Sequence, residues 1–273
     1  MSLDDVGRRG LFLLGCGKMG SAMLQGWLAQ GIAPASVWVM DPKPSDWLTG
    51  LAAEGLHLNE GVPGAPAIAL LAVKPQMMGD ALGPVTALGG GETLILSIAA
   101  GTPIRYFEEA FGASTPIIRA MPNTPAAIGK GITAITGNGA AGEAHLALAE
   151  ALLAAIGQTV RLEGEHQMDA VTAVSGSGPA YVFHLIETMA VAGEAEGLPR
   201  ALALHLAKAT VAGAGALAEA ASADPSQLRV NVTSPAGTTA AALEVLMDET
   251  DGFPPLLRRA VAAAAQRGRE LAE

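Results

Sequence analysis

Short, uninterrupted apolar runs recur through the first part of the chain, and they constrain its fold more than any other feature. They lie at 11–14 (LFLL), 37–40 (VWVM), 67–73 (AIALLAV) and 93–98 (TLILSI). A strand with one face in water alternates polar and apolar residues, whereas a strand covered on both faces is apolar throughout. Such runs are typical of a parallel sheet with helices on each side. We therefore expect an α/β fold with a doubly wound, Rossmann-type parallel sheet.

The segments around these runs complete the pattern. Apolar residues recur at helical spacing over 19–30, and a second helix is expected over about 45–54. The stretches 116–119 and 132–135 are candidates for the last strands of the sheet, and 159–162 for a short strand that follows them. The first half of the chain thus alternates strand and helix.

From about residue 165 the strand signals stop. Four segments are expected to be helices, and several consist almost entirely of Ala and Leu: 180–196, 199–221, 237–246 and 254–273. A helix that is apolar all round is buried, yet so short a domain has little interior in which to bury them. We therefore expect some of these helices to pack against a second copy of the chain. The predicted organisation is a dinucleotide-binding Rossmann domain over 1–163 and an all-helical dimerisation and substrate domain over 164–273.

The charge balance is acidic, with 16 Lys and Arg against 26 Asp and Glu and a net charge of −10. Nucleic acids and anionic membranes bind concentrated cations, and no basic cluster is longer than a pair, so we expect neither as a partner. No apolar run approaches the ~18–20 residues of a membrane span. The single cysteine can form no internal disulfide, and no Cys/His spacing suits zinc. We expect a cytoplasmic protein without a metal.

A glycine-rich turn follows the first apolar run and opens the first predicted helix, with the pattern G-x-G-x-x-G. The first glycine permits the tight turn, the second allows the backbone to approach a pyrophosphate, and the third allows close packing of helix on strand. The start of the helix then presents free N–H groups to the phosphates. The sequence predicts a dinucleotide site at Gly15, Cys16, Gly17, Lys18, Met19 and Gly20.

A carboxylate at the end of the second run bears on the choice of dinucleotide. Asp41 follows Gly20 by 21 residues, where an acidic side chain accepts hydrogen bonds from the adenosine ribose. It would repel a 2′-phosphate and favour NADH, whereas Lys43 and Ser45 would favour NADPH by holding that phosphate. We expect both cofactors to work.

A second cluster of small residues, SPAGTT at 234–239, precedes a predicted helix. Ser and Thr at this place are ordinarily helix caps, but consecutive backbone N–H groups also form a carboxylate site, and the residues alone leave both interpretations open. The motifs of serine hydrolases, zinc proteases and P-loop enzymes are absent from the sequence. Reduction of a carbonyl requires a proton donor beside the oxygen, whereas a protonated imine only has to be held against a hydride donor.

Taken together, these stretches resemble the pyrroline-5-carboxylate reductase family. The matching segments are LFLLGCGKMG at 11–20, LLAVKPQ at 70–76, SIAAG at 97–101, RAMPNTPAAIGKG at 119–131, DAVTAVSGSGPAY at 169–181 and LRVNVTSPAGTTAAALEVLMDE at 228–249. The resemblance implies reduction of 1-pyrroline-5-carboxylate to L-proline, the last step of proline biosynthesis, with NADPH as the cofactor and NADH admitted by Asp41. It also implies a homodimer with interleaved helices, and a decamer as a larger assembly.

The resemblance also implies roles for individual residues. Besides the glycine turn and Asp41, the cofactor would contact Asn59, Val73, Lys74, Pro75, Ala100 and Asn231. The substrate would be bound by Glu165, contributed by the neighbouring subunit, and by Ser234, Gly237, Thr238 and Thr239. The Thr239 hydroxyl would face the ring nitrogen as the catalytic group. One departure concerns the cofactor: where many bacterial members carry Asn-Arg, this chain has Asp41-Pro42.

Three other functions are weighed against this one. A β-hydroxyacid dehydrogenase relies on a lysine early in the second domain, but no lysine lies between residues 130 and 208. A reductase of another cyclic imine, such as a six-membered piperideine carboxylate, is closer in chemistry. A nucleotide-sensing module without turnover would have no need of a carboxylate site in the second domain.

Overall fold

The computed structural model describes residues 3–271, which form two compact units. The first unit extends to Gly176 and includes the residues from Ala265 onward, and the second comprises Ser177–Ala264. The sequence predicts a domain boundary after residue 163, where the strand signals end. When the chain is divided into compact units, residues 164–176 and the end of the C-terminal helix belong to the first unit.

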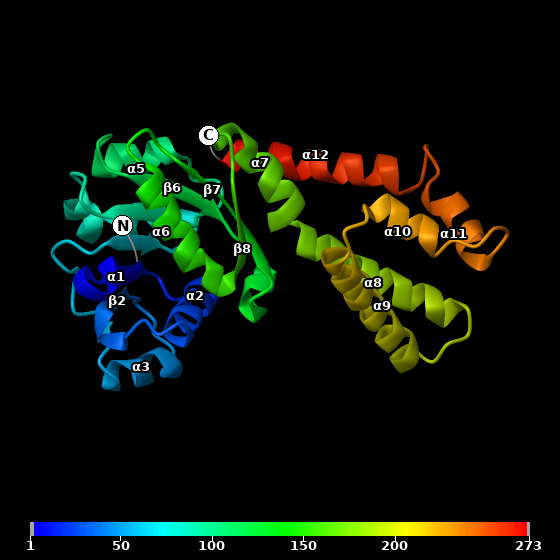
Figure 1. The fold of residues 1–273 in the computed structure, drawn as a ribbon, viewed down its shortest axis with the longest axis horizontal. Coiled ribbons are helices and arrows are strands. Elements are labelled where there is room, and N and C mark those ends of the chain that lie inside the picture. Colours follow the sequence, from blue (N-terminus) through cyan, green and yellow to red (C-terminus); the bar gives the residue numbers. More distant parts are fainter. Residues whose placement is uncertain (1–2, 272–273) are drawn as a thin grey trace. The chain divides into compact units, whose positions relative to one another are not determined.

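The first unit is built on an eight-stranded sheet in the order β3-β2-β1-β4-β5-β6-β7-β8 (Figure 1). Neighbouring strands from β3 to β6 are parallel, and the predicted α/β fold is confirmed. The strands are β1 (Leu11–Leu14), β2 (Val37–Met40), β3 (His57–Leu58), β4 (Ile68–Leu71), β5 (Leu94–Ser97), β6 (Ile117–Met121), β7 (Gly131–Gly137) and β8 (Gly157–Arg161).

Strand β7 departs from the parallel pattern, because it runs antiparallel to β6. Its connection from β6 spans residues 122–130 and contains only a 3₁₀ turn over Thr124–Ile128. A parallel neighbour requires a crossover of a dozen or more residues, usually with a helix. The short connection therefore reverses the chain, and β8 then pairs with β7 in parallel.

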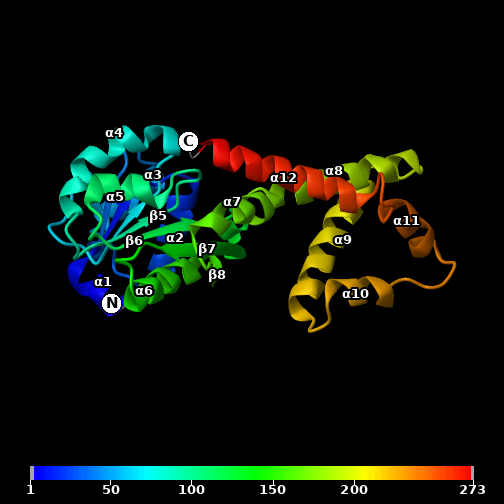
Figure 2. The same ribbon diagram turned by 90° about the horizontal axis from the view of Figure 1, so that it is seen from above.

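Helices cover both faces of the sheet, as Figure 2 shows. They are α1 (Leu3–Arg9), α2 (Lys18–Ala29), α3 (Asp46–Ala53), α4 (Met78–Leu82), α5 (Ile104–Phe111), α6 (Glu143–Leu153) and α7 (Met168–Val171). Leu11 and Leu13 of β1 pack in one apolar cluster with α2, α3 and α6, whereas Phe12 and Leu14 pack in another with α4 and α5. Alternate side chains of one strand enter opposite cores, which is why the run shows no polar alternation.

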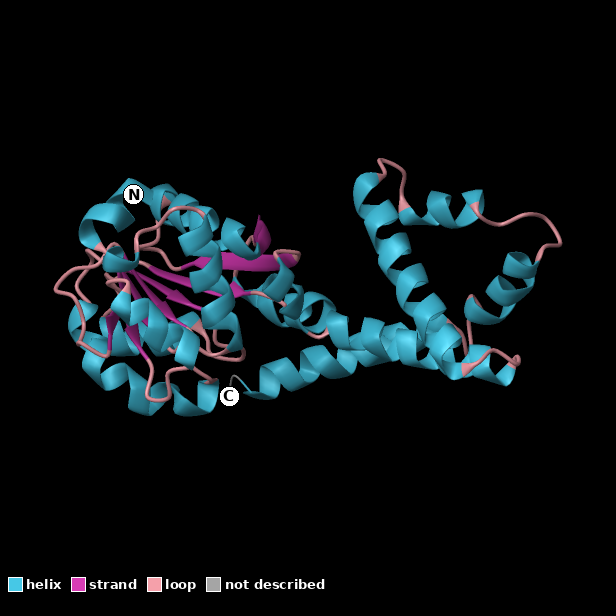
Figure 3. Ribbon diagram, turned by 90° about the horizontal axis from the view of Figure 1, so that it is seen from below, coloured by secondary structure: helices cyan, strands magenta, loops and turns pink. Residues whose placement is uncertain are grey.

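The second unit contains helices and loops in its described residues (Figure 3). Its helices are α8 (Gly178–Ala195), α9 (Arg200–Ala220), α10 (Pro225–Asn231), α11 (Thr238–Leu246) and most of α12 (Phe253–Leu271). Its buried core consists of Ala190, Ala203 and Ala207, with Ile186 packed beside them. Three small side chains are too little core for a unit of this size.

Many large apolar side chains of this unit are exposed in the single chain, as on α8 and α9, where Phe183, Val191 and Leu217 are 55–65% exposed. One helix, α9, is long and apolar enough to cross a membrane, although only 11% of its most apolar window is buried. This corrects the expectation that no segment reaches that length. The same surface fits the predicted packing against a second copy of the chain.

Candidate cofactor and substrate sites

The glycine turn lies at the carboxyl end of β1, between the ends of β2 and β4. Gly15 has φ +87°, in the region that favours glycine, and its N–H donates to the Met40 carbonyl at 2.8 Å. A Cβ atom at Gly15 would lie 2.8 Å from Val73 Cγ1 and 3.0 Å from the Ala72 carbonyl oxygen. Only glycine fits this position.

The other two glycines of the turn have different surroundings. A Cβ at Gly20 would lie 2.5 Å from the Gly15 carbonyl oxygen, so glycine allows α2 to pack against the turn. Gly17 is the N-cap of α2, and a Cβ there would meet no atom of the described residues within 4 Å. In those residues it has no side-chain cap, and the first N–H groups of a helix have no intrahelical partner. The open space and the free donors fit a pyrophosphate.

The Asp41 carboxylate is bound directly to this turn. Its Oδ2 accepts the Cys16 N–H at 2.7 Å, and its Oδ1 accepts the Lys43 N–H at 2.8 Å. Asn59, with φ +57°, fixes the Asp41 backbone: its Oδ1 accepts the Asp41 N–H and its Nδ2 donates to the Asp41 carbonyl, both at 2.9 Å. Burial, and secondarily the Asp41 charge, raises the pKa of the Cys16 thiol to about 12, so the thiol is neutral at physiological pH.

The remaining predicted cofactor residues follow the next two parallel strands. Val73, Lys74 and Pro75 come directly after β4, and Ala100 comes after β5. Because the carboxyl ends of parallel strands share one edge of the sheet, these residues lie along the same edge as the glycine turn. Next to Ala100, a Cβ at Gly101 would lie 3.2 Å from Leu271 Cβ, so the last turn of α12 packs on this loop.

Glu165 has partners that the sequence did not reveal. Its Oε1 accepts from Arg119 Nη1 at 2.7 Å and from the Ile104 N–H at 2.8 Å. The carboxylate therefore caps α5 and neutralises a guanidinium that is only 5% exposed. The Glu165 side chain remains 32% exposed. A substrate role for Glu165 would use this exposed part.

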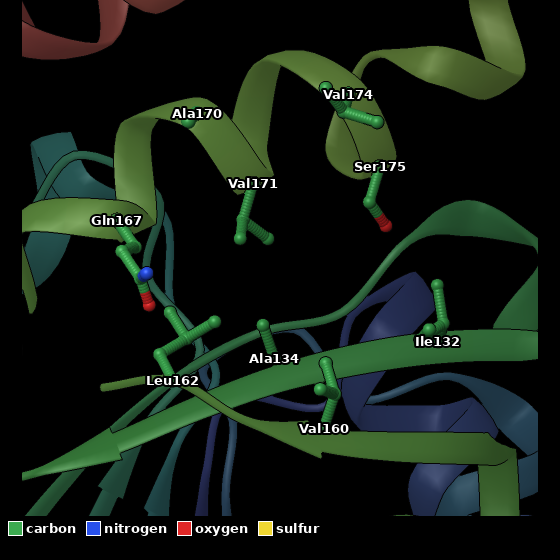
Figure 4. Close-up of a pocket in the computed structure, with 9 residues that line it drawn as sticks. All are labelled: Ile132, Ala134, Val160, Leu162, Gln167, Ala170, Val171, Val174 and Ser175. Atoms are coloured by element: carbon green, nitrogen blue, oxygen red, sulfur yellow. The ribbon is translucent and has the colours of Figure 1, made fainter. Parts of the chain in front are cut away.

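Two of the segments that carry the family resemblance, 119–131 and 169–181, are joined by hydrogen bonds within the first unit. Asn123 Oδ1 accepts the Ile132 N–H at 3.0 Å, and its Nδ2 donates to the carbonyl and hydroxyl oxygens of Ser175 at 3.4 and 3.3 Å. Sequence reasoning gave neither residue a role. Beside them is a cavity of about 400 Å³ between β7–β8 and the α7 segment (Figure 4). It is lined by Ile132, Ala134, Val160, Leu162, Gln167, Ala170, Val171, Val174 and Ser175. This lining is too apolar to bind a carboxylate.

The second unit contains the predicted carboxylate site at the start of α11. Gly237 is the N-cap, without a side-chain cap in the described residues, and a Cβ there would lie 2.4 Å from Ser234 Oγ. Thr238 is exposed and Thr239 half-buried at the first two helical positions, where N–H groups have no intrahelical partner. Asn231 ends α10, and its Oδ1 accepts from Gln227 at 2.8 Å. The geometry of the turn suits a small anion.

Comparison with known proteins covers both units. Residues 165–271 match the family described as pyrroline-5-carboxylate reductase dimerisation, and residues 11–101 match NADP oxidoreductase coenzyme F420-dependent. The chain is 38% identical over 263 residues to a pyrroline-5-carboxylate reductase from Pseudomonas aeruginosa, covering 95% of this chain and 96% of that protein. A pyrroline-5-carboxylate reductase from Pisum sativum is also 38% identical, over 96% of this chain and 95% of its own length.

Solved structures agree with these sequence relationships. A pyrroline-5-carboxylate reductase from Coxiella burnetii superimposes with a TM-score of 0.90 at 31% identity, over 97% of this chain and 99% of that one. The pyrroline carboxylate reductase of Plasmodium falciparum, solved with NADP bound, gives a TM-score of 0.82 at 28% identity, over 97% and 98% of the two chains.

Proposed function

The chain belongs to the pyrroline-5-carboxylate reductase family, and we propose that it reduces 1-pyrroline-5-carboxylate to L-proline by hydride transfer from NADPH. It is an NADP-linked oxidoreductase. One observation carries the assignment of the reaction: reductases of this substrate are related to the chain over almost its whole length, including the segments of both proposed anion sites.

The cofactor would be held along the carboxyl edge of the sheet. The free N–H groups at the start of α2 would bind the pyrophosphate, and Asp41 with Asn59 would lie at the adenosine side. Lys74, Pro75 and Ala100 would line the path toward the nicotinamide, on the segments after β4 and β5. When bound, the reduced nicotinamide supplies the hydride that the reaction consumes.

The substrate carboxylate would be bound by the N–H groups of Thr238 and Thr239, with the positive end of the α11 dipole adding to the attraction. The Gly237 N–H, expected from the sequence as a third donor, instead donates to the Ser234 carbonyl at 3.1 Å and holds the turn in shape. Asn231 would extend toward the nicotinamide side. Glu165 would come from the neighbouring subunit.

Thr239 is proposed to orient the reacting nitrogen. The substrate reacts as the iminium, whose N–H donates to Thr239 Oγ1. As hydride adds at the imine carbon (C2 of the pyrroline ring, which becomes C5 of proline), the electron pair of the C=N bond moves to the nitrogen, which keeps its proton and becomes the amine of proline. No strong acid is needed at this site, because the nitrogen is protonated before the transfer.

The second unit makes the protein a homo-oligomer, as its match to the dimerisation family indicates. We propose a homodimer formed through the exposed apolar faces of α8 and α9, with a decamer of five dimers as the larger assembly. The location is proposed to be the cytoplasm, in keeping with a single, neutral cysteine thiol.

The test is to mix the protein with NADPH and 1-pyrroline-5-carboxylate and to follow the loss of the reduced-nicotinamide absorbance. We expect stoichiometric formation of L-proline. No oxidation of the cofactor would overturn the proposal and favour a nucleotide sensor. A higher kcat/KM for a six-membered piperideine carboxylate would instead assign the chain to another cyclic imine.

A further inference from the structure

The loop between β5 and α5, residues 98–103, presents one exposed position from a buried base. Ala99 and Thr102 are only 3% and 8% exposed, whereas Ala100 is exposed. At the start of the loop, the Ala99 N–H donates to Ser97 Oγ at 3.2 Å. Because the loop follows a parallel strand, it lies at the carboxyl edge of the sheet, where Ala100 is a proposed cofactor contact.

A buried ion pair fixes the far end of this loop. Glu165 Oε1 accepts the N–H of Ile104, the first residue of α5, at 2.8 Å and also accepts from Arg119 Nη1 at 2.7 Å. Arg119 comes from β6, where it is paired with Ser97 at the end of β5, and it is 5% exposed. A buried charge is costly unless it is paired and hydrogen-bonded. The guanidinium therefore holds the carboxylate in place, and the carboxylate holds the start of α5.

The last turn of α12 packs against the middle of the same loop. Gly101 has φ +72°, and a Cβ there would lie 3.2 Å from Leu271 Cβ and 3.6 Å from the Leu271 carbonyl oxygen. That turn rests in its turn on α7, since a Cβ at Gly268 would lie 3.0 Å from Asp169 Oδ1. Glycine at these two positions lets the loop, α7 and the end of α12 approach closely.

The two contacts come from opposite ends of one segment of the chain. Glu165 and Leu271 are the first and last residues of the segment that matches the dimerisation family. Both ends of that segment thus contact one loop of the dinucleotide-binding unit. A loop that is fixed before its ligand arrives loses less conformational freedom on binding, so its contacts contribute more to affinity.

We propose that Glu165, Arg119 and the last turn of α12 are positioning elements, which hold the 98–103 loop in the conformation that receives the nicotinamide half of the cofactor. They act through the loop and need no contact with the cofactor. The proposal rests on the proposed function in one respect, that the nicotinamide lies along this loop. It gives Glu165 a task that is separate from any contact with the substrate.

The experiment is calorimetric titration of the full chain with NADPH and with 2′-phospho-ADP-ribose, which lacks the nicotinamide. Glu165→Ala removes the shared acceptor, and Gly268→Leu displaces the end of α12 from α7 while leaving the ion pair in place. Each variant should weaken NADPH binding about tenfold, because the loop must then be ordered by the ligand. The dissociation constant of 2′-phospho-ADP-ribose should change less than about twofold, since its proposed contacts lie elsewhere. Glu165→Gln keeps the acceptor oxygen and should restore most of the affinity for NADPH.

The matched control is Glu150→Ala, which takes another carboxylate from an arginine of the same unit, Arg161, to which it is bonded at 2.7 Å. It should leave both dissociation constants unchanged. Urea unfolding of each variant identifies those that are folded under the titration conditions. Unchanged NADPH affinity in Glu165→Ala and Gly268→Leu would overturn the proposal. So would an equal loss for both ligands, which is the result of a general loss of structure.

The titrations contain no imine, so they are independent of the reaction. A chain that separates the two ligands as expected but does not reduce 1-pyrroline-5-carboxylate would refute the reductase function and leave the positioning role of Glu165 supported. A chain that reduces the imine while both variants bind NADPH normally would refute the positioning role alone.

Discussion

Replacing Gly17 with alanine should weaken cofactor binding without loosening the fold, whereas replacing Gly20 should do both. The two glycines lie three residues apart in the same turn. A Cβ at Gly17 meets nothing within 4 Å among the described residues, and its φ of −70° suits any residue. A Cβ at Gly20 lies 2.5 Å from the Gly15 carbonyl oxygen, which is backbone and does not yield easily.

The magnitudes follow from these contacts. Alanine is a poorer N-cap than glycine, but it also restricts the unfolded chain, which is worth about 0.4–1 kcal/mol, so Gly17→Ala should change stability by less than ~1 kcal/mol. Its methyl group fills the space proposed for the pyrophosphate. Loss of one charge-assisted hydrogen bond costs about 1.5–3 kcal/mol, or ~10–100-fold in the dissociation constant for NADPH. Overpacking at Gly20 should cost about 1–3 kcal/mol of unfolding free energy.

The assay combines thermal melting of the protein alone with calorimetric titration of NADPH. Gly20→Ala should lower the melting temperature by ~2–10 °C for a unit of this size and should also weaken binding. Gly17→Ala should melt like the unmodified protein and bind weakly. If Gly17→Ala binds NADPH with unchanged affinity, the pyrophosphate does not lie at this turn, and the interpretation of the open space is wrong.

Four further results are expected. Thr239→Ala should lower kcat by ~10–100-fold, the loss of one orienting hydrogen bond, whereas Thr238→Ala, which keeps its backbone donor, should not; an unaltered kcat/KM would remove Thr239 from the mechanism. Glu165→Ala leaves a buried guanidinium without its carboxylate and should cost about 1–3 kcal/mol in urea unfolding, with a smaller loss for Glu165→Gln; equal losses would contradict this. Arg161 lowers the pKa values of the Glu143 and Glu150 carboxyls on α6 by hydrogen bonding to them. The ion pairs between Arg161 and these two carboxylates therefore stabilise the fold above the ordinary carboxyl pKa of about 4.3. This stabilisation is lost as the pH falls through the lowered pKa values. The melting difference from Arg161→Met should therefore be present at neutral pH and vanish in acid; a difference that persists in acid would refute the account. Leu217→Asp, on the exposed face of α9, should reduce the mass seen by light scattering toward the 27.4 kDa of one chain, and an unchanged mass would exclude this face from the interface.

Most of the strands that sequence reasoning identified are buried; β8, predicted over 159–162, is the exception, since its residues are exposed or half-buried. In β1, all four residues are buried and alternate between two apolar clusters. An uninterrupted run of apolar residues therefore predicts this strand correctly. Strand β3 has two half-buried residues, His57 and Leu58, and its sequence shows no such run. The direction of β7 is not encoded in its own residues either, because it depends on the length of the connection before it.

Helices α1, α5, α6 and α7 of the first unit were not predicted, although the sequence contains a signal for α5. In α5, Ile104, Phe107 and Phe111 are buried at spacings of three and four, the pattern of an amphipathic helix. The buried Arg119 was missed for another reason. A charge inside an apolar strand indicates a partner, but that partner, Glu165, lies 46 residues further along the chain, and spacing alone does not find it.

The two proposed anion sites depend on the same local choice, a helix that begins after a glycine. α3 and α10 are capped by the side chains of Ser45 and Asp224, which occupy the first N–H groups and stabilise the helix. α2 and α11 begin after Gly17 and Gly237, with no side-chain cap in the described residues, so their donors are left to a ligand. A glycine start is not sufficient, since α6 also begins after one, Gly142. The two sites share close packing beside a glycine: a Cβ at Gly20 would lie 2.5 Å from the Gly15 carbonyl oxygen, and a Cβ at Gly237 would lie 2.4 Å from Ser234 Oγ and 3.1 Å from the Ser234 carbonyl oxygen. Such packing fixes the donors in place before a ligand arrives, and this makes these two turns the places where phosphate and carboxylate are expected to bind.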